Sequence, residues 1–552
     1  MPTPSTKPST LTTLFAAFAV SASLVISGLP VGAQEAGPPP LREAAVRPSL
    51  SPLPAPQRTS HSLALPGRTL KFSATAGSIT ITEADGVVSA DVAYVAYTLD
   101  GAEPATRPVV FAFNGGPGSA STWLHLGALG PWRVPLTIET MTAASPPALL
   151  ANAETWLDFA DLVFIDPPGT GYSRIWPSQP VTAPVAVPPV DGNAARRRGR
   201  VGIASTIGTE RFWSVSGDIA VFVRVIDSWL TRHERRTSPV VLVGESYGGF
   251  RAPLIAEELA NAHSIAVRAM VLVSPVLDFD GRRGSWRLPQ SHVALLPSMA
   301  ATRLERTGTV PSRAALADVE AYARSDYLVD LLRGPRDVPA VLRMAERVAA
   351  LSGIPIESVT GQAARFTIGT FLALSPDLKD TGASIYDAGM AGFAPARGER
   401  RGGFADPFTA GLDPPLTSAM ETLYQQLNWR PGRPYAMLAN EINRRWIWPN
   451  SPHPPQALSA LLGLHRKDVR LATLVTHGLT DLVTPYLASA IQLDQVPVHA
   501  TNRISLEVYP GGHMFYSRDA SRARFRDDAR RIIDDAIGPG TKKEAGDRRE
   551  TP

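Results

Sequence analysis

Alternation of apolar and polar residues divides the predicted strands of this chain into two kinds. Thr69–Thr75, Gly77–Thr82 and Val88–Thr98 alternate and are rich in β-branched residues, which is typical of antiparallel strands at a sheet edge. Later runs are short and almost wholly apolar, as in parallel strands that are covered on both faces. These runs are Pro108–Phe113, Asp161–Ile165, Pro239–Val243, Ala269–Val276, Leu471–Thr476 and Ile504–Val508.

Helical periodicity separates several of the apolar runs. Val215–Arg232, Phe250–Ala262 and Ala520–Ile537 follow this period, and strand–helix–strand spacing predicts a parallel sheet with covering helices. From about residue 281 to residue 455 we find predicted helices without buried parallel strands, so we expect a helical insertion over the sheet. The helices expected there are Pro311–Ala323, Val338–Leu351, Leu416–Leu427 and Tyr435–Trp446.

The first residues have the pattern of a secretory signal peptide. Lys7 is followed by the apolar run Leu14–Ser27 and by small residues at Val31–Ala33. This run is shorter than the ~20 apolar residues of a spanning helix. We therefore expect an exported protein, periplasmic or secreted, without stable membrane insertion after the signal is removed.

These patterns together predict the division of the chain. We expect a signal peptide over 1–33, a proline-rich linker over 34–62, a first core part over 63–280, a helical cap over 281–455, a second core part over 456–538 and a disordered tail over 539–552.

Composition excludes several functional classes. The chain has 552 residues, 44% of them hydrophobic, and no cysteine. A large core is therefore possible, whereas disulfides, cysteine catalysis and thiolate metal sites are excluded. A net charge of +4 from scattered basic residues gives no nucleic-acid footprint. The histidines do not stand at ligand spacings, so we expect no metal and no cofactor; oligomeric state is not indicated.

The strongest local motif is Gly244-Glu245-Ser246-Tyr247-Gly248, which lies between an apolar strand and a predicted helix. Gly-x-Ser-x-Gly in this context is the nucleophile elbow, in which a sharp turn projects the serine hydroxyl at the positive end of a helix. An ordinary glycine turn is the alternative.

A serine nucleophile needs a base and an orienting acid, and in elbow proteins the chain order is serine, acid, histidine. Asp481 and His513 follow the last two predicted strands in that order. His477 is a rival base, but its place at a strand end favours local packing, and His499 precedes the last strand. For each residue alone, a locally hydrogen-bonded loop position is the alternative.

Acyl transfer also needs two donors for the developing oxyanion. One is the backbone N–H of Tyr247, after the candidate nucleophile. The glycine-rich turn Asn114-Gly115-Gly116-Pro117-Gly118, after an earlier strand, offers the other. A plain turn is the alternative.

Several motifs together resemble the serine carboxypeptidase family, in order, over roughly Phe72 to Arg530. The matching stretches are Asn114–Gly118, Asp166–Ser173, Gly244–Gly249, Asp481 in its loop and Gly511–Met514. The chain looks most similar to the bacterial exported branch, which lacks disulfides.

The resemblance implies an α/β-hydrolase fold: a mostly parallel central sheet with a helical cap insertion. It implies a catalytic triad, oxyanion donors on two backbone N–H groups, and recognition of a peptide's free C-terminal carboxylate. The residues it assigns are Ser246, Asp481 and His513 for the triad, Gly116 and Tyr247 for the oxyanion hole, and Asn114, Gly115 and Glu245 for the carboxylate.

Three positions depart from the family pattern. Ala112 replaces a usual tryptophan, Ser119 replaces a usual cysteine, and Ala128 replaces the glutamate that shares a proton with the one before the serine. Two close carboxylates cannot both be charged cheaply, so the loss at Ala128 requires desolvation or another partner to control Glu245.

The function that the sequence favours is therefore a serine carboxypeptidase acting through an acyl-enzyme on Ser246. An esterase or acyltransferase with the same triad is the first alternative. A catalytically silent exported binding protein is the second.

Overall fold

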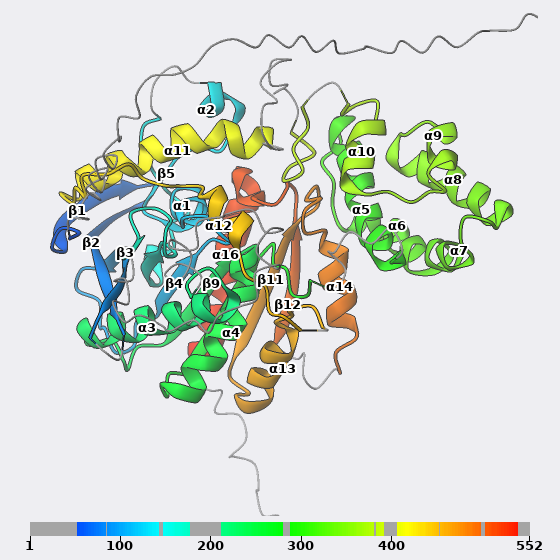
Figure 1. Ribbon diagram of the computed structural model, residues 1–552. Helices are drawn as coiled ribbons and strands as arrows, with labels where there is room; N and C mark the ends of the chain where they lie inside the picture. Colours follow the sequence, from blue (N-terminus) through cyan, green and yellow to red (C-terminus); the bar gives the residue numbers. More distant parts are fainter. Residues whose placement is uncertain are drawn as a thin grey trace, which may run out of the picture. The chain divides into compact units, whose positions relative to one another are not determined.

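The computed structural model describes residues 52–83, 86–142, 147–176, 211–279, 288–379, 382–390, 406–451, 453–497 and 503–538. Within them, ten strands form one sheet in the order β1-β2-β3-β7-β4-β9-β10-β11-β12, with β8 beside β3 (Figure 1). The strands are β1 Gln57–Leu65, β2 Arg68–Thr82, β3 Val88–Leu99, β4 Val109–Phe113, β7 Asp161–Ile165, β8 Arg174–Ile175, β9 Val240–Glu245, β10 Val267–Val273, β11 Ala472–Gly478 and β12 Ile504–Tyr509. A separate pair is formed by β5 Trp132–Arg133 and β6 Leu150–Ala151.

Strand pairing changes once across the sheet, from antiparallel to parallel at β7. β1, β2, β3 and β7 pair in antiparallel fashion, and every pair from β7 through β4, β9, β10 and β11 to β12 is parallel. The expected antiparallel edge and parallel interior are confirmed.

The edge strands are longer than expected. The runs Thr69–Thr75 and Gly77–Thr82 belong to the single strand β2, in which Gly77 pairs with Tyr94 of β3. A side chain at Gly77 would stand 2.8 Å from Pro56, so the glycine admits a close neighbour instead of breaking the strand.

The linker expected over 34–62 also ends earlier than the sequence suggests. β1 begins at Gln57 because its backbone is paired with β2 along its whole length. The rest of that segment up to residue 51, the expected signal peptide and the expected tail lie outside the described residues.

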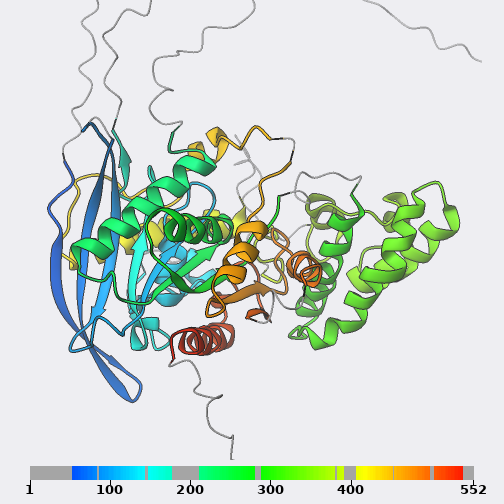
Figure 2. The same ribbon diagram turned by 90° about the horizontal axis from the view of Figure 1, so that it is seen from below.

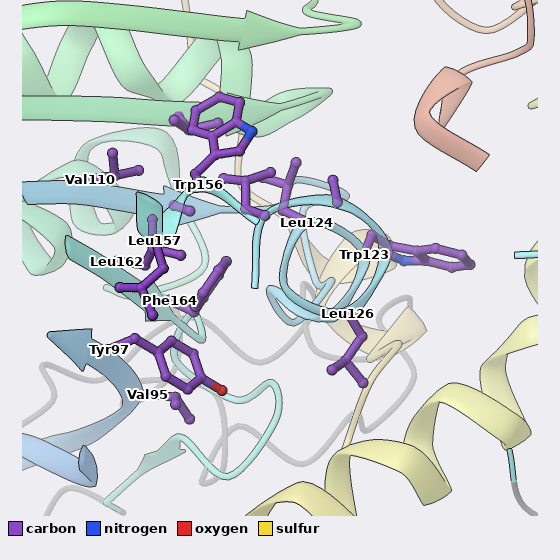
Figure 3. Close-up of a cluster of buried hydrophobic side chains, with 14 of the residues drawn as sticks. Val95, Tyr97, Val110, Trp123, Leu124, Leu126, Trp156, Leu157, Leu162 and Phe164 are labelled. Carbon is purple, nitrogen blue, oxygen red and sulfur yellow. The ribbon is translucent and has the colours of Figure 1, made fainter. Parts of the chain in front are cut away.

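Helices cover both faces of the sheet because alternate residues of the strands point to two cores. In β4, Val110 and Ala112 join one core, and Phe111 and Phe113 join the other. Figure 3 shows part of the first core, where Val110 and residues of β7 gather with Trp156 and Leu157. The first core takes in α1 Thr122–Leu124, the π-helix His125–Leu129, α11 Pro407–Gln426 and α16 Asp519–Ile537; the second takes in α3 Val215–Arg232, α4 Tyr247–Ala262 and α13 Leu458–Lys467.

A third core belongs to a group of helices beside α14, Tyr486–Asp494 (Figures 1 and 2). The group consists of α5 Pro289–Arg306, α6 Ala317–Tyr322, α7 Leu328–Arg333, α8 Val338–Ser352, α9 Ile356–Gly361 and α10 Ile368–Leu374. A 3₁₀ turn, Ala314–Leu316, precedes α6, and a π-helix, Ala323–Tyr327, joins α6 to α7. The remaining short elements are α2 Ile138–Thr142, α12 Asn440–Arg445 and the 3₁₀ turns Trp156–Asp158 and Phe515–Ser517.

The segment expected to form one helical cap over 281–455 is thus divided. α11 packs into the first core of the sheet, and α12 contributes Ile442 to the second. The helix expected over Tyr435–Trp446 is reduced to α12 because the chain before it is extended against the core, where Ala436 exchanges both backbone hydrogen bonds with Gly171. α11 begins earlier than expected because Asp406 caps its first turn.

Among the described residues, we find no helix whose length and apolar character would allow it to cross a membrane.

Candidate active site

Ser246 lies in a strained turn between β9 and α4. Its φ of 61° and ψ of −119° are unfavourable for a residue with a side chain, and such strain is characteristic of functional turns. The Ser246 N–H donates to the carbonyl of Val273 at 2.8 Å. A Cβ at Gly244 would stand 2.1 Å from the carbonyl oxygen of Gly248, so the turn requires glycine. The expected elbow geometry is present.

Asp481 and His513 form a buried pair at the neighbouring strand ends. Nδ1 of His513 is 2.7 Å from Oδ2 of Asp481, and both side chains are almost fully buried. The other oxygen of Asp481 accepts the backbone N–H groups of Val483 (2.8 Å) and Thr484 (2.9 Å). Burial would raise the pKa of Asp481, but His513 and the donors of Thr484 outweigh it, so the pKa lies below its usual value. The carboxylate therefore stays charged and can hold the Nδ1–H tautomer of the imidazole.

Hydrogen bonds of the Ser274 backbone and hydroxyl link this pair to the turn that carries Ser246. Ser274 directly follows β10, which lies between β9 and β11. Its N–H donates to Thr476 of β11, and its hydroxyl donates to the carbonyl of His513, each at 2.7 Å. Ser246 is bonded to Val273, the residue before Ser274. The three candidate residues thus follow the carboxyl ends of β9, β11 and β12 in the parallel part of the sheet, where such sites form.

A segment between α10 and α11 also supports His513. The carbonyl of Tyr386 accepts the N–H of His513 at 2.5 Å, and the Tyr386 ring meets the imidazole edge-on at 5.3 Å. Ser384 is in turn bonded to Asp406. No motif marks Tyr386 in the sequence, because it acts through contacts with a strand end more than a hundred residues away.

The turn after β4 lies directly against the elbow. A Cβ at Gly115 would stand 2.5 Å from the backbone nitrogen of Tyr247. The carbonyl of Asn114 accepts from the buried side chain of Arg251 at 2.8 Å, which holds the turn in place. Within the described part of the chain, the N–H groups of Gly116 and Tyr247 have no hydrogen-bond acceptor. Two backbone donors are therefore available next to Ser246.

Glu245 is buried beside this turn and has a partner that the sequence did not suggest. Its Oε2 accepts the hydroxyl of Tyr516 at 2.5 Å. Burial raises the pKa of Glu245 to about 7, against the lowering influence of His513, Tyr516 and Asn114, with Asp481 raising it further. In a chain that has Ala128 instead of a second carboxylate, Glu245 thus has a tyrosine hydroxyl as its partner.

Asn114 supplies a further polar group at this place. Its Oδ1 accepts the N–H of Leu124 at 3.1 Å. Its Nδ2 is buried and meets no acceptor at hydrogen-bond distance and angle among the described residues, although it lies near enough to Glu245 to lower the pKa of that carboxyl group. An unsatisfied buried donor is costly, and it is characteristic of a place where a ligand acceptor completes the hydrogen bond.

The rival base His477 does not contribute to the site. Both ring nitrogens of His477 are engaged locally, by the carbonyl of Thr484 at 3.0 Å and the hydroxyl of Ser489 at 2.9 Å. Burial lowers the pKa of His477 to about 4, so it is a neutral packing residue. His499 lies outside the described residues. In the described part of the chain, no three metal-binding side chains come together.

Comparison with known sequences agrees with this geometry. The sequence model of the serine carboxypeptidase family matches residues 66–283, which include the turn after β4 and the elbow. Over these residues, the chain is similar to the serine carboxypeptidase family.

Curated proteins with similar sequences match over part of their length. Serine carboxypeptidase-like 16 of Arabidopsis thaliana is 28% identical over 247 residues, covering 43% of this chain and 48% of the relative. The pheromone-processing carboxypeptidase of Cryptococcus gattii is 46% identical over 66 residues, covering 12% of this chain and 9% of the relative. The chain therefore aligns with less than half of the length of these relatives.

A solved structure extends the likeness to most of the fold. The prohormone-processing carboxypeptidase from Saccharomyces cerevisiae superimposes with a TM-score of 0.50 at 15% identity, covering 84% of this chain and 90% of that one. At 15% sequence identity, the match supports a similar fold and nothing about function. The chain has the expected α/β-hydrolase fold.

Proposed function

We propose that this chain is a serine-type carboxypeptidase that removes C-terminal residues from peptides through an acyl-enzyme on Ser246. The observation that carries the proposal is the buried Asp481–His513 pair, linked through the hydroxyl and backbone of Ser274 to the strained turn of Ser246. The family match to residues 66–283 supports the same chemistry.

The proposed cycle begins with attack of the Ser246 hydroxyl oxygen on the scissile carbonyl. His513 takes the hydroxyl proton and then delivers it to the leaving amine, while Asp481 stabilises the imidazolium through Nδ1. Water, deprotonated by His513, next attacks the acyl-enzyme and releases the shortened peptide. The cycle restores both the serine hydroxyl and the neutral imidazole.

The N–H groups of Gly116 and Tyr247 are the proposed donors to the oxyanion of each tetrahedral intermediate. Gly115 makes this possible, because its lack of a side chain lets the turn lie against the elbow. Preorganised donors of this kind each contribute about 10²–10³ in rate.

We expect Gly115→Ala to reduce peptide release by at least about 100-fold, because the added methyl would displace the turn by part of an ångström or more. Its Cβ would stand 2.5 Å from the nitrogen of Tyr247 and 2.7 Å from the carbonyl oxygen of Glu245. The matched control is Gly369→Ala in α10, where a Cβ meets nothing within 4 Å. Steady-state kcat/KM checks the pair, and equal losses in both variants would contradict the role of the turn.

The proposed substrate end is the free carboxylate of a peptide, bound by Asn114, Gly115 and Glu245. The buried, unpartnered Nδ2 of Asn114 offers a donor to that carboxylate. With its pKa near 7, Glu245 is largely protonated in weak acid and can donate as well. This set favours a free C-terminus over an ester or amide.

A matched pair of substrates tests the proposal. An N-blocked dipeptide with a free C-terminus is expected to release its last residue at least ten times faster than the same dipeptide amidated, measured by chromatography at pH 6. Equal turnover of both would indicate an esterase or amidase instead. The matched variant Ser246→Ala must lose both activities for either to be assigned to this site.

Location is part of the proposal as well. The signal-like residues 1–33 support export to the periplasm or beyond, and the absence of cysteine from the chain is compatible with the bacterial exported branch. Mass spectrometry of the N-terminus of the exported protein would test the cleavage after residue 33.

A further inference from the structure

Tyr516 is the closest polar partner of Glu245. Its hydroxyl donates to Oε2 at 2.5 Å, and both side chains are nearly or fully buried. The phenol lies in the 3₁₀ turn Phe515–Ser517, three residues after His513. The same side chain therefore links the loop of the candidate base to the residue before the candidate nucleophile.

Packing holds the Tyr516 ring in one place. A Cβ at Gly127 would stand 2.8 Å from Cε2 of Tyr516, so the ring lies directly on the π-helix that contains Ala128. The backbone carbonyl of Tyr516 accepts from Arg522 of α16 at 3.3 Å. With its ring packed on the π-helix and its backbone held by Arg522, Tyr516 presents its hydroxyl to Glu245 in a constant direction.

The Tyr516 hydroxyl donates to one carboxyl oxygen of Glu245, and this determines which oxygen can carry a proton. With Oε2 occupied by Tyr516, a proton on the carboxyl group resides on the other oxygen, where it can be donated to a ligand. The titratable and polar groups around Glu245 come from three strand ends and one turn: Asp481 after β11, His513 after β12, Asn114 after β4, and Tyr516.

We propose, on the basis of the carboxypeptidase function above, that Tyr516 is a positioning residue that orients Glu245 and sets the pH range in which the site accepts a peptide with a free carboxylate. A tyrosine partner brings no second titrating carboxyl group. Within this pair, only the carboxyl group of Glu245 gains or loses a proton, and the Tyr516 hydroxyl is the hydrogen-bond donor in both states.

The sign of the pH effect follows from the two states of Glu245. Below its pKa of about 7, Glu245 is neutral and donates to the substrate carboxylate; above it, the two carboxylates repel. The Tyr516 hydroxyl stabilises the charged form. Its removal raises the pKa of Glu245, and the alkaline decline of kcat/KM moves to higher pH.

The test compares Tyr516→Phe with Tyr509→Phe. Tyr509 is a buried tyrosine that also donates to a carboxylate, Asp528 at 2.9 Å, outside the site. For the free dipeptide, we expect the alkaline midpoint to rise by about one to two pH units in Tyr516→Phe, as for loss of one hydrogen bond to a charged group. It should stay in place in Tyr509→Phe. An unchanged midpoint in Tyr516→Phe, or an equal shift in both, overturns the proposal.

A second variant tests the same hydrogen bond if the Tyr516→Phe protein does not fold. Replacement of Tyr516 by 3-fluorotyrosine preserves the ring and makes the hydroxyl a stronger donor, so the alkaline midpoint should fall instead of rise. A midpoint that stays or rises contradicts the assignment. The amidated dipeptide should lack this alkaline decline in the wild type, since it carries no carboxylate.

Infrared titration separates this proposal from the proposed function. The carboxyl band of Glu245, identified by its loss in Glu245→Gln, should titrate at a higher pH in Tyr516→Phe whether or not peptides are cleaved. If the band moves in Tyr516→Phe but the wild type releases no residue from peptides, the carboxypeptidase function is contradicted. The hydrogen-bonded pair of Tyr516 and Glu245 is supported by the same result. An unmoved band would overturn the role of Tyr516 even in an active enzyme.

Discussion

Ser246→Ala is expected to lower the release of C-terminal residues by about 10⁴- to 10⁶-fold, because it removes the oxygen that forms the acyl-enzyme. The turn should keep its shape, since the backbone bond from Ser246 to Val273 does not use the hydroxyl. Initial rates with the free dipeptide, at saturating concentration, measure the loss in kcat.

The matched control for this variant is Ser352→Ala. Ser352 is a fully buried serine of α8 whose hydroxyl donates to the carbonyl of Val348 at 2.7 Å, outside the site. Its activity should remain within about twofold of the wild type. Residual activity above a tenth in Ser246→Ala would place the nucleophile elsewhere.

Asp481→Asn is expected to lower kcat by about 10⁴-fold with little change in the fold. The remaining oxygen can still accept the N–H groups of Val483 and Thr484, so the new amide nitrogen faces His513. Nδ1 of His513 must then accept, and its proton moves to Nε2. The imidazole in that tautomer cannot take the proton of Ser246.

Asp528→Asn provides the comparison, because Asp528 accepts the Tyr509 hydroxyl in a pair outside the site. We expect it to keep nearly full activity. Both variants should show cooperative thermal unfolding by circular dichroism, which separates loss of chemistry from loss of fold. If Asp481→Asn retained more than about 1% of kcat, Asp481 would not be the acid that orients His513.

The fold could be predicted well where local pattern and final contacts agree. The period-3.6 pattern of Val215–Arg232 and the apolar run Asp161–Ile165 have the same bounds in α3 and β7. The predicted secondary structure was wrong where contacts with distant segments determine the conformation of the chain. Tyr435–Trp446 has helical character, but its first residues pair with Gly171 and form extended chain instead.

The same distinction applies to the site. Ser246, Asp481 and His513 follow strand ends in a fixed order, so a one-dimensional pattern identifies them as candidates. Tyr386 and Tyr516 have no such pattern: each acts through a contact with a segment far away in the chain, and a tyrosine in a loop has no distinctive spacing. Replacement of a usual glutamate by Ala128 indicated that desolvation or another partner controls Glu245, but not which residue such a partner would be.

The central claim is that Ser246 is a nucleophile activated by His513. A fluorophosphonate probe tests it directly: the folded protein is labelled, digested, and its peptides are analysed by mass spectrometry. We predict one adduct, on the peptide that contains Ser246, and at least about a hundredfold slower labelling in His513→Ala. An unlabelled Ser246 in the folded protein, or equal labelling rates in the two proteins, would contradict the account.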